Sequence, residues 1–147
     1  MNTLHVKIAT PFGLYKEFDT PIINIQTVDG DRGVLANHMP LVTMLKIGVM
    51  TSEENNVRNT YAVAGGLFYF RNNVAEILTD AIENRNEIDV ERAEKAKQRA
   101  EGHLKSNDPN IDMRRAEVAL KKAMNRISVS SMTYNIGNNR NTVPVVL

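Results

Sequence analysis

The sequence predicts an α+β protein, in which an N-terminal antiparallel, flattened β-sandwich (residues 1–87) is followed by a C-terminal antiparallel two-helix hairpin (residues 88–130). Two observations predict this order. Short apolar runs separated by turn residues recur through residues 1–87, whereas residues 88–130 are dense in charge, with ten Lys or Arg and seven Asp or Glu. Residues 131–147 show no sustained periodicity, so we expect a flexible tail there.

The strands of the sandwich are predicted from alternation and from turn residues. Leu4, Val6 and Ile8 alternate with polar or small residues, which is the period of a half-buried strand. Asp29-Gly30 and Arg71-Asn72-Asn73 are turn signals that separate later runs. About eight short strands at this turn spacing favour a sandwich or flattened barrel; the later runs cover residues 14–18, 22–28, 44–50, 57–64, 67–70 and 74–78.

One stretch within this half, residues 30–41, is predicted to be an ordered loop. It holds two glycines three residues apart, followed by His38 and Pro40. A lone histidine without a carboxylate partner is rarely catalytic, so a structural turn with a hydrogen-bonded His38 is favoured over a catalytic role.

The second half contains two helical patterns with a break between them. Asp89 is a good N-cap for a first helix that ends near Lys105, and a second helix is expected from about Asp112 to Ile127. Residues 106–110 form the break. The apolar stripes are mostly alanine, which buries little area, so we expect a hairpin that can open or move; they comprise Ala93, Ala96, Ala100 and Leu104, then Ala116, Ala119, Leu120, Ala123 and Ile127.

The composition excludes several classes of function. The net charge of +1 and the lack of aromatic residues among the basic helices argue against nucleic-acid binding. The chain has no Cys and three well-separated His residues, so we expect no metal site. We find no phosphate-binding glycine loop, dinucleotide fingerprint or nucleophile–base pair, and expect a non-catalytic protein without a membrane span or a stable homo-oligomer.

The second predicted helix carries a basic face. Arg115, Lys122 and Arg126 are spaced by seven and four residues and therefore fall within one stripe. Such a stripe can hold phosphate or meet an acidic partner surface. The alternative is a solvated charged face with pairs such as Glu117 and Lys121.

An ordered set of motifs resembles the epsilon subunit of the bacterial F-type ATP synthase over about residues 1–130. The set comprises the loop 30–41, Val63-Ala64-Gly65-Gly66-Leu67, Ile77-Leu78-Thr79-Asp80, the segment 88–93, and the segment 115–126. The resemblance implies that the protein is a stalk subunit of a proton-translocating ATP synthase. It also implies that the complex holds the protein at the cytoplasmic face of the bacterial cell membrane.

The resemblance also implies partners and contact residues. Asp31 is the expected contact with the c-ring, and His38 the expected contact with the gamma subunit. The hairpin is implied to act as a brake on ATP hydrolysis, with its basic second helix meeting acidic segments of the alpha/beta catalytic head. The residues expected to make that contact are Arg115, Lys121, Lys122 and Arg126.

A second role is also implied, because some members resemble ATP sensors that bind ATP with the hairpin folded down. Ile88, Asp89, Arg92 and Ala93 match the segment that those members use, and Arg126 matches a phosphate-side position. Lys122 stands where such members commonly have Arg, and Lys loses the bidentate geometry, so weak ATP binding or none is expected. Glu83 and Arg99 are further candidate contacts by position only. An adaptor unrelated to the synthase is the remaining alternative.

Overall fold

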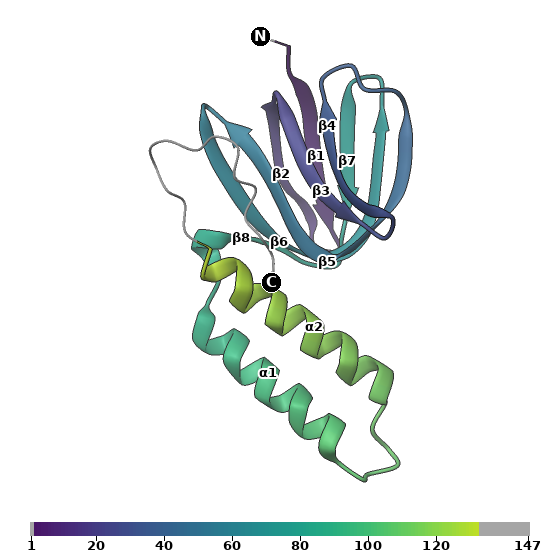
Figure 1. Ribbon diagram of the computed structural model, residues 1–147, viewed down its shortest axis with the longest axis vertical. Coiled ribbons are helices and arrows are strands. Elements are labelled where there is room, and N and C mark those ends of the chain that lie inside the picture. Colours follow the sequence, from purple (N-terminus) through teal and green to yellow (C-terminus); the bar gives the residue numbers. More distant parts are fainter. Residues whose placement is uncertain (1, 133–147) are drawn as a thin grey trace. The chain divides into compact units, whose positions relative to one another are not determined.

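The computed structural model describes residues 2–132, and the predicted tail lies almost entirely outside the described residues. Contacts divide the chain into two compact units, Met1–Arg85 and Asn86–Leu147. The first unit is a β-sandwich and the second holds two helices, so the predicted fold class is confirmed (Figure 1).

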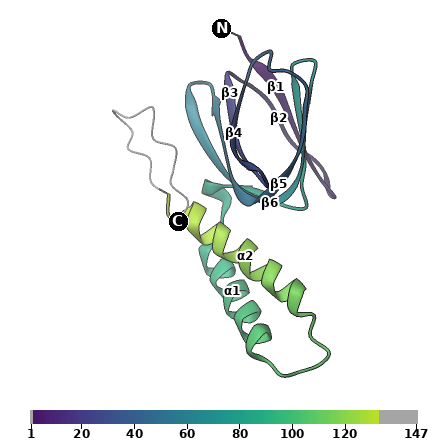
Figure 2. The same ribbon diagram turned by 45° about the vertical axis from the view of Figure 1, so that its right-hand side comes forward.

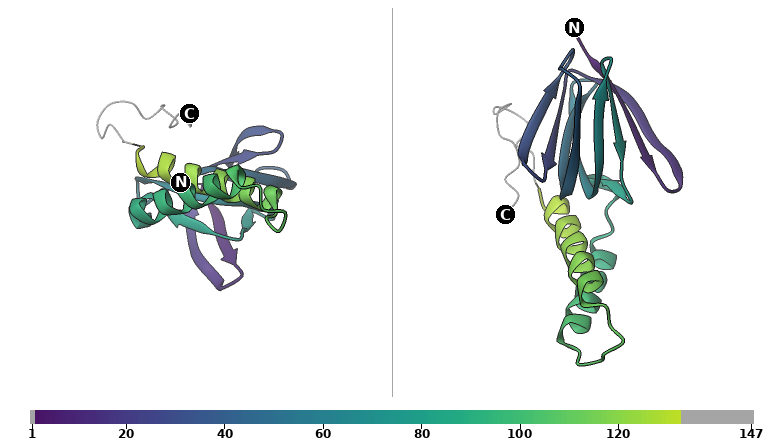
Figure 3. Two further views of the ribbon diagram at one scale, coloured as in Figure 1. Left: turned by 90° about the horizontal axis from the view of Figure 1, so that it is seen from below. Right: turned by 90° about the vertical axis from the view of Figure 1, so that its right-hand side faces the viewer.

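The sandwich is built from one continuous eight-stranded sheet whose order is β2-β1-β7-β6-β5-β3-β4, with β8 paired to β6. Figure 2 shows its two layers, and the right-hand view of Figure 3 shows the strands side by side. The strands are β1 (Leu4–Thr10), β2 (Gly13–Thr20), β3 (Ile22–Thr27), β4 (Gly30–Leu35), β5 (Leu41–Glu54), β6 (Val57–Arg71), β7 (Val74–Leu78) and β8 (Ile82–Asn84).

The strand β6 joins the two layers because it changes partner along its length. Val63 pairs with Ile82 of β8, whereas Leu67 pairs with Leu78 of β7. Between them lie Gly65 and Gly66, with φ of +78° and +124°, a conformation that side chains with a Cβ rarely adopt. The two glycines therefore let one strand bend from one layer into the other without a shift in its register with β5.

Three details of the sheet differ from the sequence prediction. Residues 30–35, predicted as part of a loop, form the edge strand β4 against β3. Residues 57–71, predicted as two runs, form one strand. Within this otherwise antiparallel sheet, β1 and β7 pair in parallel, from His5 opposite Val74 to Ala9 opposite Leu78.

The core lies between the layers and is filled by alternate residues of the strands. Leu4, Val6 and Ile8 are fully buried, as their alternation predicts. The other layer contributes Ile23, Ile25 and Val34. The remaining buried side chains of the cluster are Leu45, Met50, Tyr61, Val63, Phe68, Phe70, Ala75, Ile77 and Ile82.

The short 3-10 helix η1 (Arg85–Glu87) lies at the boundary between the two units. The second unit contains α1 (Val90–Lys105) and α2 (Met113–Ser130), which run antiparallel (Figure 1). The predicted N-cap Asp89 is confirmed, because its carboxylate accepts from the Arg92 amide at 3.0 Å. Asp112, predicted only as the approximate start of the second helix, caps α2 in the same way and accepts from the Arg115 amide at 3.1 Å. The alanine seam is buried at Ala93, Ala100, Ala116 and Ala123. Ala119, predicted for the seam, is exposed instead.

None of the helices within residues 2–132 is long and apolar enough to span a membrane.

Candidate functional site

A row of outward-facing apolar side chains, four of them exposed and the fifth, Ala9, half-buried, crosses five strands of the sandwich. Strand register places its members directly opposite one another. Their neighbours Leu45, Phe68, Ile77 and Ile8 point into the core, so the row points outward. Met44 is 62% exposed, Leu67 37%, Leu78 49% and Leu14 63%. This row, called the apolar row below, consists of Met44, Leu67, Leu78, Ala9 and Leu14, in that order across the sheet.

Two further exposed side chains lie near the two ends of the apolar row. Val28 is 60% exposed, and its amide donates to the Met44 carbonyl at 3.0 Å. Phe12, in the turn before β2, is 98% exposed and lines a shallow depression together with Leu14, Tyr15 and Ile82. An exposed apolar surface shared by several strands is a candidate interaction face. The sequence alone does not reveal the row, because its members lie on five strands and are brought together by four strand pairings.

Asp31 and His38, the two sandwich residues predicted to contact partners, lie near opposite ends of β4. Asp31 is the second residue of the strand, is exposed, and lies opposite Gln26. The turn before it is fixed by Thr27, whose hydroxyl accepts from the Asp29 amide at 3.1 Å and donates to the Gly30 carbonyl at 2.8 Å.

His38 lies three residues beyond the end of β4 and is half-buried. Its Nδ1 is 2.6 Å from the Met39 carbonyl, and its ring meets the ring of Phe70 edge-on, with centroids 5.9 Å apart. The amide of Asn37 donates to Asn73 Oδ1 at 2.8 Å, which ties this loop to the β6–β7 turn. The hydrogen-bonded structural turn that the sequence favoured is therefore confirmed.

The basic face of α2 is present as predicted. The helix carries five Lys or Arg residues and one Glu, which gives it the larger positive charge of the two helices. Arg115 and Lys121 are exposed, whereas Lys122 and Arg126 are half-buried beside the alanine seam. No salt bridge within residues 2–132 involves Arg115, Lys121 or Lys122, so the predicted Glu117–Lys121 pair does not form. On α1, by contrast, Lys95 pairs with Glu91.

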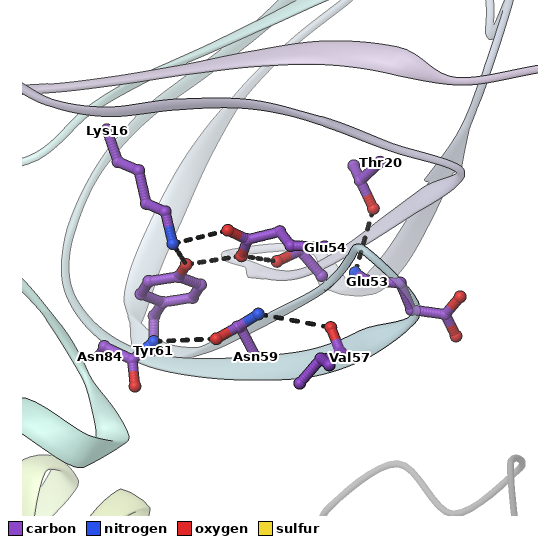
Figure 4. A network of polar contacts seen from close by, with 9 residues as sticks. Lys16, Thr20, Glu53, Glu54, Val57, Asn59, Tyr61 and Asn84 are labelled. Atoms are coloured by element: carbon purple, nitrogen blue, oxygen red, sulfur yellow. Dashed lines mark hydrogen bonds and ion pairs between the residues drawn. The ribbon is translucent and has the colours of Figure 1, made fainter.

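A polar network inside the sandwich was not predicted (Figure 4). Lys16 Nζ lies 2.5 Å from Glu54 Oε1 and donates to the Tyr61 hydroxyl at 2.9 Å. Glu54 Oε2 accepts from the Tyr61 hydroxyl at 2.7 Å and from the Ser52 hydroxyl at 2.8 Å. Because Tyr61 is fully buried, an unpaired hydroxyl there would be costly, and the network satisfies it.

The network sets the protonation of its members. Burial raises the pKa of Tyr61 to about 12, since the hydrogen bond from Lys16 offsets only part of that effect. Burial opposes ionisation of Glu54, yet the hydrogen bonds from Lys16, Tyr61 and Ser52 outweigh it and lower its pKa. Burial likewise opposes the charge on Lys16, but hydrogen bonds to Glu54 and Tyr61 raise its pKa. The pair therefore stays charged across the neutral range, and its role is structural.

Comparison with known proteins assigns both units. Residues 3–85 match the beta-sandwich domain of the ATP synthase delta/epsilon chain, and residues 86–131 match its long alpha-helix domain. The chain belongs to the ATP synthase delta/epsilon chain family.

Close relatives and a solved structure agree with this family. The chain is 40% identical over 131 residues to the ATP synthase epsilon chain of Halalkalibacterium halodurans, covering 88% of this chain and 98% of that one. It is 42% identical over 131 residues to the epsilon chain of Bacillus pumilus, with the same coverage. A chain in the cryo-EM structure of Euglena gracilis mitochondrial ATP synthase (OSCP/F1/c-ring) superposes with a TM-score of 0.69 at 26% identity, covering 82% of this chain and 77% of that one.

Within this delta/epsilon chain, the residues predicted to bind ATP lie in both units. Asp89 and Arg92 stand at the start of α1, and the antiparallel hairpin places that end beside the end of α2, where Arg126 lies (Figure 1). Lys122 lies one turn earlier on α2, Arg99 lies midway along α1, and Ile88 is half-buried before the helix. Glu83 belongs to β8 of the sandwich unit. The Asp89 carboxylate already caps α1.

No group of three or more His, Asp or Glu side chains that could hold a metal ion occurs among residues 2–132.

Proposed function

We propose that this protein is the epsilon subunit in the central stalk of a proton-translocating F-type ATP synthase. It is a non-catalytic subunit that helps couple rotation to catalysis and inhibits ATP hydrolysis through its helical hairpin. The observation that carries the proposal is the match of both family domains, in order, over residues 3–131. The relatives from Halalkalibacterium halodurans and Bacillus pumilus, which match over 131 residues, are named ATP synthase epsilon chains.

The sandwich provides the contacts with the stalk. The apolar row and the adjacent Val28 offer an exposed apolar face, which favours a stable protein partner, and we assign it to the gamma subunit. His38, near the start of β5, is the polar contact with the same partner. Asp31, near the opposite end of β4 from His38, faces the c-ring. The regions at the two ends of β4 would thus contact two different partners, the c-ring and gamma. The subunit is then peripheral to the cytoplasmic face of the bacterial membrane.

The hairpin provides the brake. A seam of alanine methyl groups between α1 and α2 buries little area, so opening or reshaping the hairpin costs little free energy. Arg115, Lys121 and Lys122 have no acidic partner within residues 2–132, and together with Arg126 they suit acidic segments of the alpha/beta head. Attraction of this kind between exposed charges weakens as salt is added.

Reconstitution tests the brake. The full chain is added to a catalytic head that contains gamma but lacks its epsilon subunit, and ATP hydrolysis is measured. We expect the wild-type chain to inhibit, and the triple variant Arg115→Gln, Lys122→Gln, Arg126→Gln to inhibit less. The matched control removes the same charge from α1 through Lys95→Gln, Lys97→Gln and Lys105→Gln, and it should inhibit like the wild type.

The outcomes separate the parts of the proposal. Binding to gamma without inhibition would leave a coupling subunit with no working brake. Failure of the folded chain to bind any head containing gamma would refute the stalk assignment and favour the adaptor alternative.

A second candidate function is ATP sensing, favoured by the position of Asp89 and Arg92 at the same end of the hairpin as Arg126. Titration calorimetry with ATP up to millimolar concentration tests it. Heat that disappears in the Arg126→Gln variant and persists in Lys95→Gln supports a site on the hairpin, and the absence of any heat removes this role.

A further inference from the structure

His5 bridges two carboxylates across the free edge of the sandwich. It lies on β1 directly opposite Asp19 of β2, and its Nδ1 is 2.7 Å from Asp19 Oδ1. Its Nε2 is 2.7 Å from Glu17 Oε1 on the same strand. Both ring nitrogens of one side chain therefore reach the neighbouring strand.

The chemistry of this geometry depends on one proton. An ionised carboxylate only accepts hydrogen bonds, so each ring nitrogen must carry a hydrogen to bond its partner. Only the imidazolium form of histidine has two N–H groups. A neutral His5 can keep one of the two bonds, and its bare nitrogen would face the other carboxylate. Hydrogen bonds to Glu17 and then to Asp19 raise the pKa of His5, as expected of an imidazolium held between carboxylates.

The other charged groups on this outer face do not replace His5. Lys7, two residues along β1, lies opposite Glu17 with its Nζ 3.9 Å from the carboxylate, and it also lies opposite Glu76 of β7. On the other flank of His5 lies Val74 of β7, with Arg71 of β6 beyond it.

The strand that His5 holds has a special place in the sheet. β2 is terminal in the strand order, and among the strands of residues 2–132 it pairs only with β1. On its inner face Lys16 joins the network with Glu54 and Tyr61, which stays charged through neutral pH. On the outer face of β2, the two hydrogen bonds to His5 depend on whether the imidazole is protonated, and a histidine can change its protonation near neutral pH.

We propose that His5, Glu17 and Asp19 form a proton-operated clamp that fixes the edge strand β2 when His5 is charged and loosens it when His5 loses its proton. A histidine with a raised pKa contributes stability that is fully present below the unfolded value of 6.5 and is lost as pH rises through the folded value. The strand therefore becomes less protected on the alkaline side of neutrality. The clamp does not depend on the proposed function of the chain.

The experiment uses the full chain and measures amide hydrogen exchange by NMR, with each rate corrected for the intrinsic exchange rate at that pH. Between pH 6 and pH 8.5, we expect protection of the β2 amides to fall by about two- to fivefold relative to β5 and β6, the range of an exposed ion pair. The same samples give the titration midpoint of His5, which should lie above 6.5, with Glu17 and Asp19 responding at the same midpoint.

Variants separate the clamp from general effects. His5→Gln should show low β2 protection at both pH values, and the Glu17→Gln, Asp19→Asn double variant should lower the His5 midpoint. Glu76→Gln removes a carboxylate of the same face that does not bond His5, and His103→Gln removes an exposed histidine of α1; both should behave as wild type. Equal β2 protection at both pH values in the wild type, or a His5 midpoint at or below 6.5, would overturn the proposal even if a variant failed to fold.

Discussion

The Tyr61 hydroxyl donates to Glu54 Oε2 over 2.7 Å, and it does so from a side chain with no exposed surface. The same hydroxyl accepts from Lys16, so one buried oxygen ties the edge strand β2 to the tip of the β5–β6 hairpin (Figure 4).

Tyr61→Phe is expected to destabilise the sandwich by about 1–2 kcal/mol, because Glu54 and Lys16 each lose a hydrogen-bond partner while the ring volume is kept. Urea unfolding followed by circular dichroism measures the change. Tyr69→Phe is the control, since the Tyr69 hydroxyl accepts one long hydrogen bond near the surface, from the Arg71 guanidinium at 3.4 Å. Equal losses for the two variants would contradict a special role for the network.

Stability should fall in acid through Glu54. Its folded pKa is lowered, so its contribution is present above the unfolded value of 4.5 and disappears as pH falls through the folded value. Unfolding midpoints in urea between pH 3 and pH 7 test this. Glu54→Gln should flatten the acid side of the profile, whereas Glu53→Gln, which changes an exposed neighbour, should leave it unchanged.

Gly66→Ala is expected to cost about 2–4 kcal/mol. A Cβ at Gly66 would lie 2.0 Å from the Leu78 carbonyl oxygen, and its φ of +124° is strained for any residue with a side chain. Thermal unfolding of the two variants Gly66→Ala and Gly102→Ala makes the comparison. Gly102 lies in α1 with open space around the added methyl, so its variant should be neutral or more stable, because Ala favours a helix over Gly.

Met44→Lys should weaken binding of the chain to a gamma-containing catalytic head by about tenfold or more, because a charge would be buried within the apolar row. Val57→Lys is closely matched: Val57 is 61% exposed on β6, compared with 62% for Met44 on β5, but it lies outside the row. Binding kinetics on an immobilised head give both values. Equal weakening would mean that the row is not the docking face.

The two helices could be predicted from short-range features of the sequence. Asp89 and Asp112 are N-caps whose effect depends only on the next three residues, so both helix starts were predicted within one residue. The end of α2 was placed three residues early, and Ala119 was assigned to the seam because helical spacing alone allows it.

Non-local pairing explains what the sequence did not reveal in the sandwich. β4 has one buried residue, Val34, so it lacks the alternation that indicates a strand, and pairing with β3 holds it in place. Leu14 and Phe18 are four residues apart and would share a face in a regular strand. The irregularity beside Ile8 and Ala9 turns Leu14 outward, while Phe18 packs on the core. The apolar row and the polar network both depend on such registers.

The parallel pairing of β1 with β7 has a consequence for synthesis. His5 pairs with Val74, so β1, once synthesised, must wait for nearly seventy further residues before its second neighbour exists. Until then only β2 can cover it, and a lone hairpin is marginally stable in water. Closure of the sandwich is therefore a late event with high contact order, which favours slow folding. The three fully buried side chains of β1 therefore stay exposed on a nascent chain until β7 is made, which is the kind of transient apolar surface that chaperones protect.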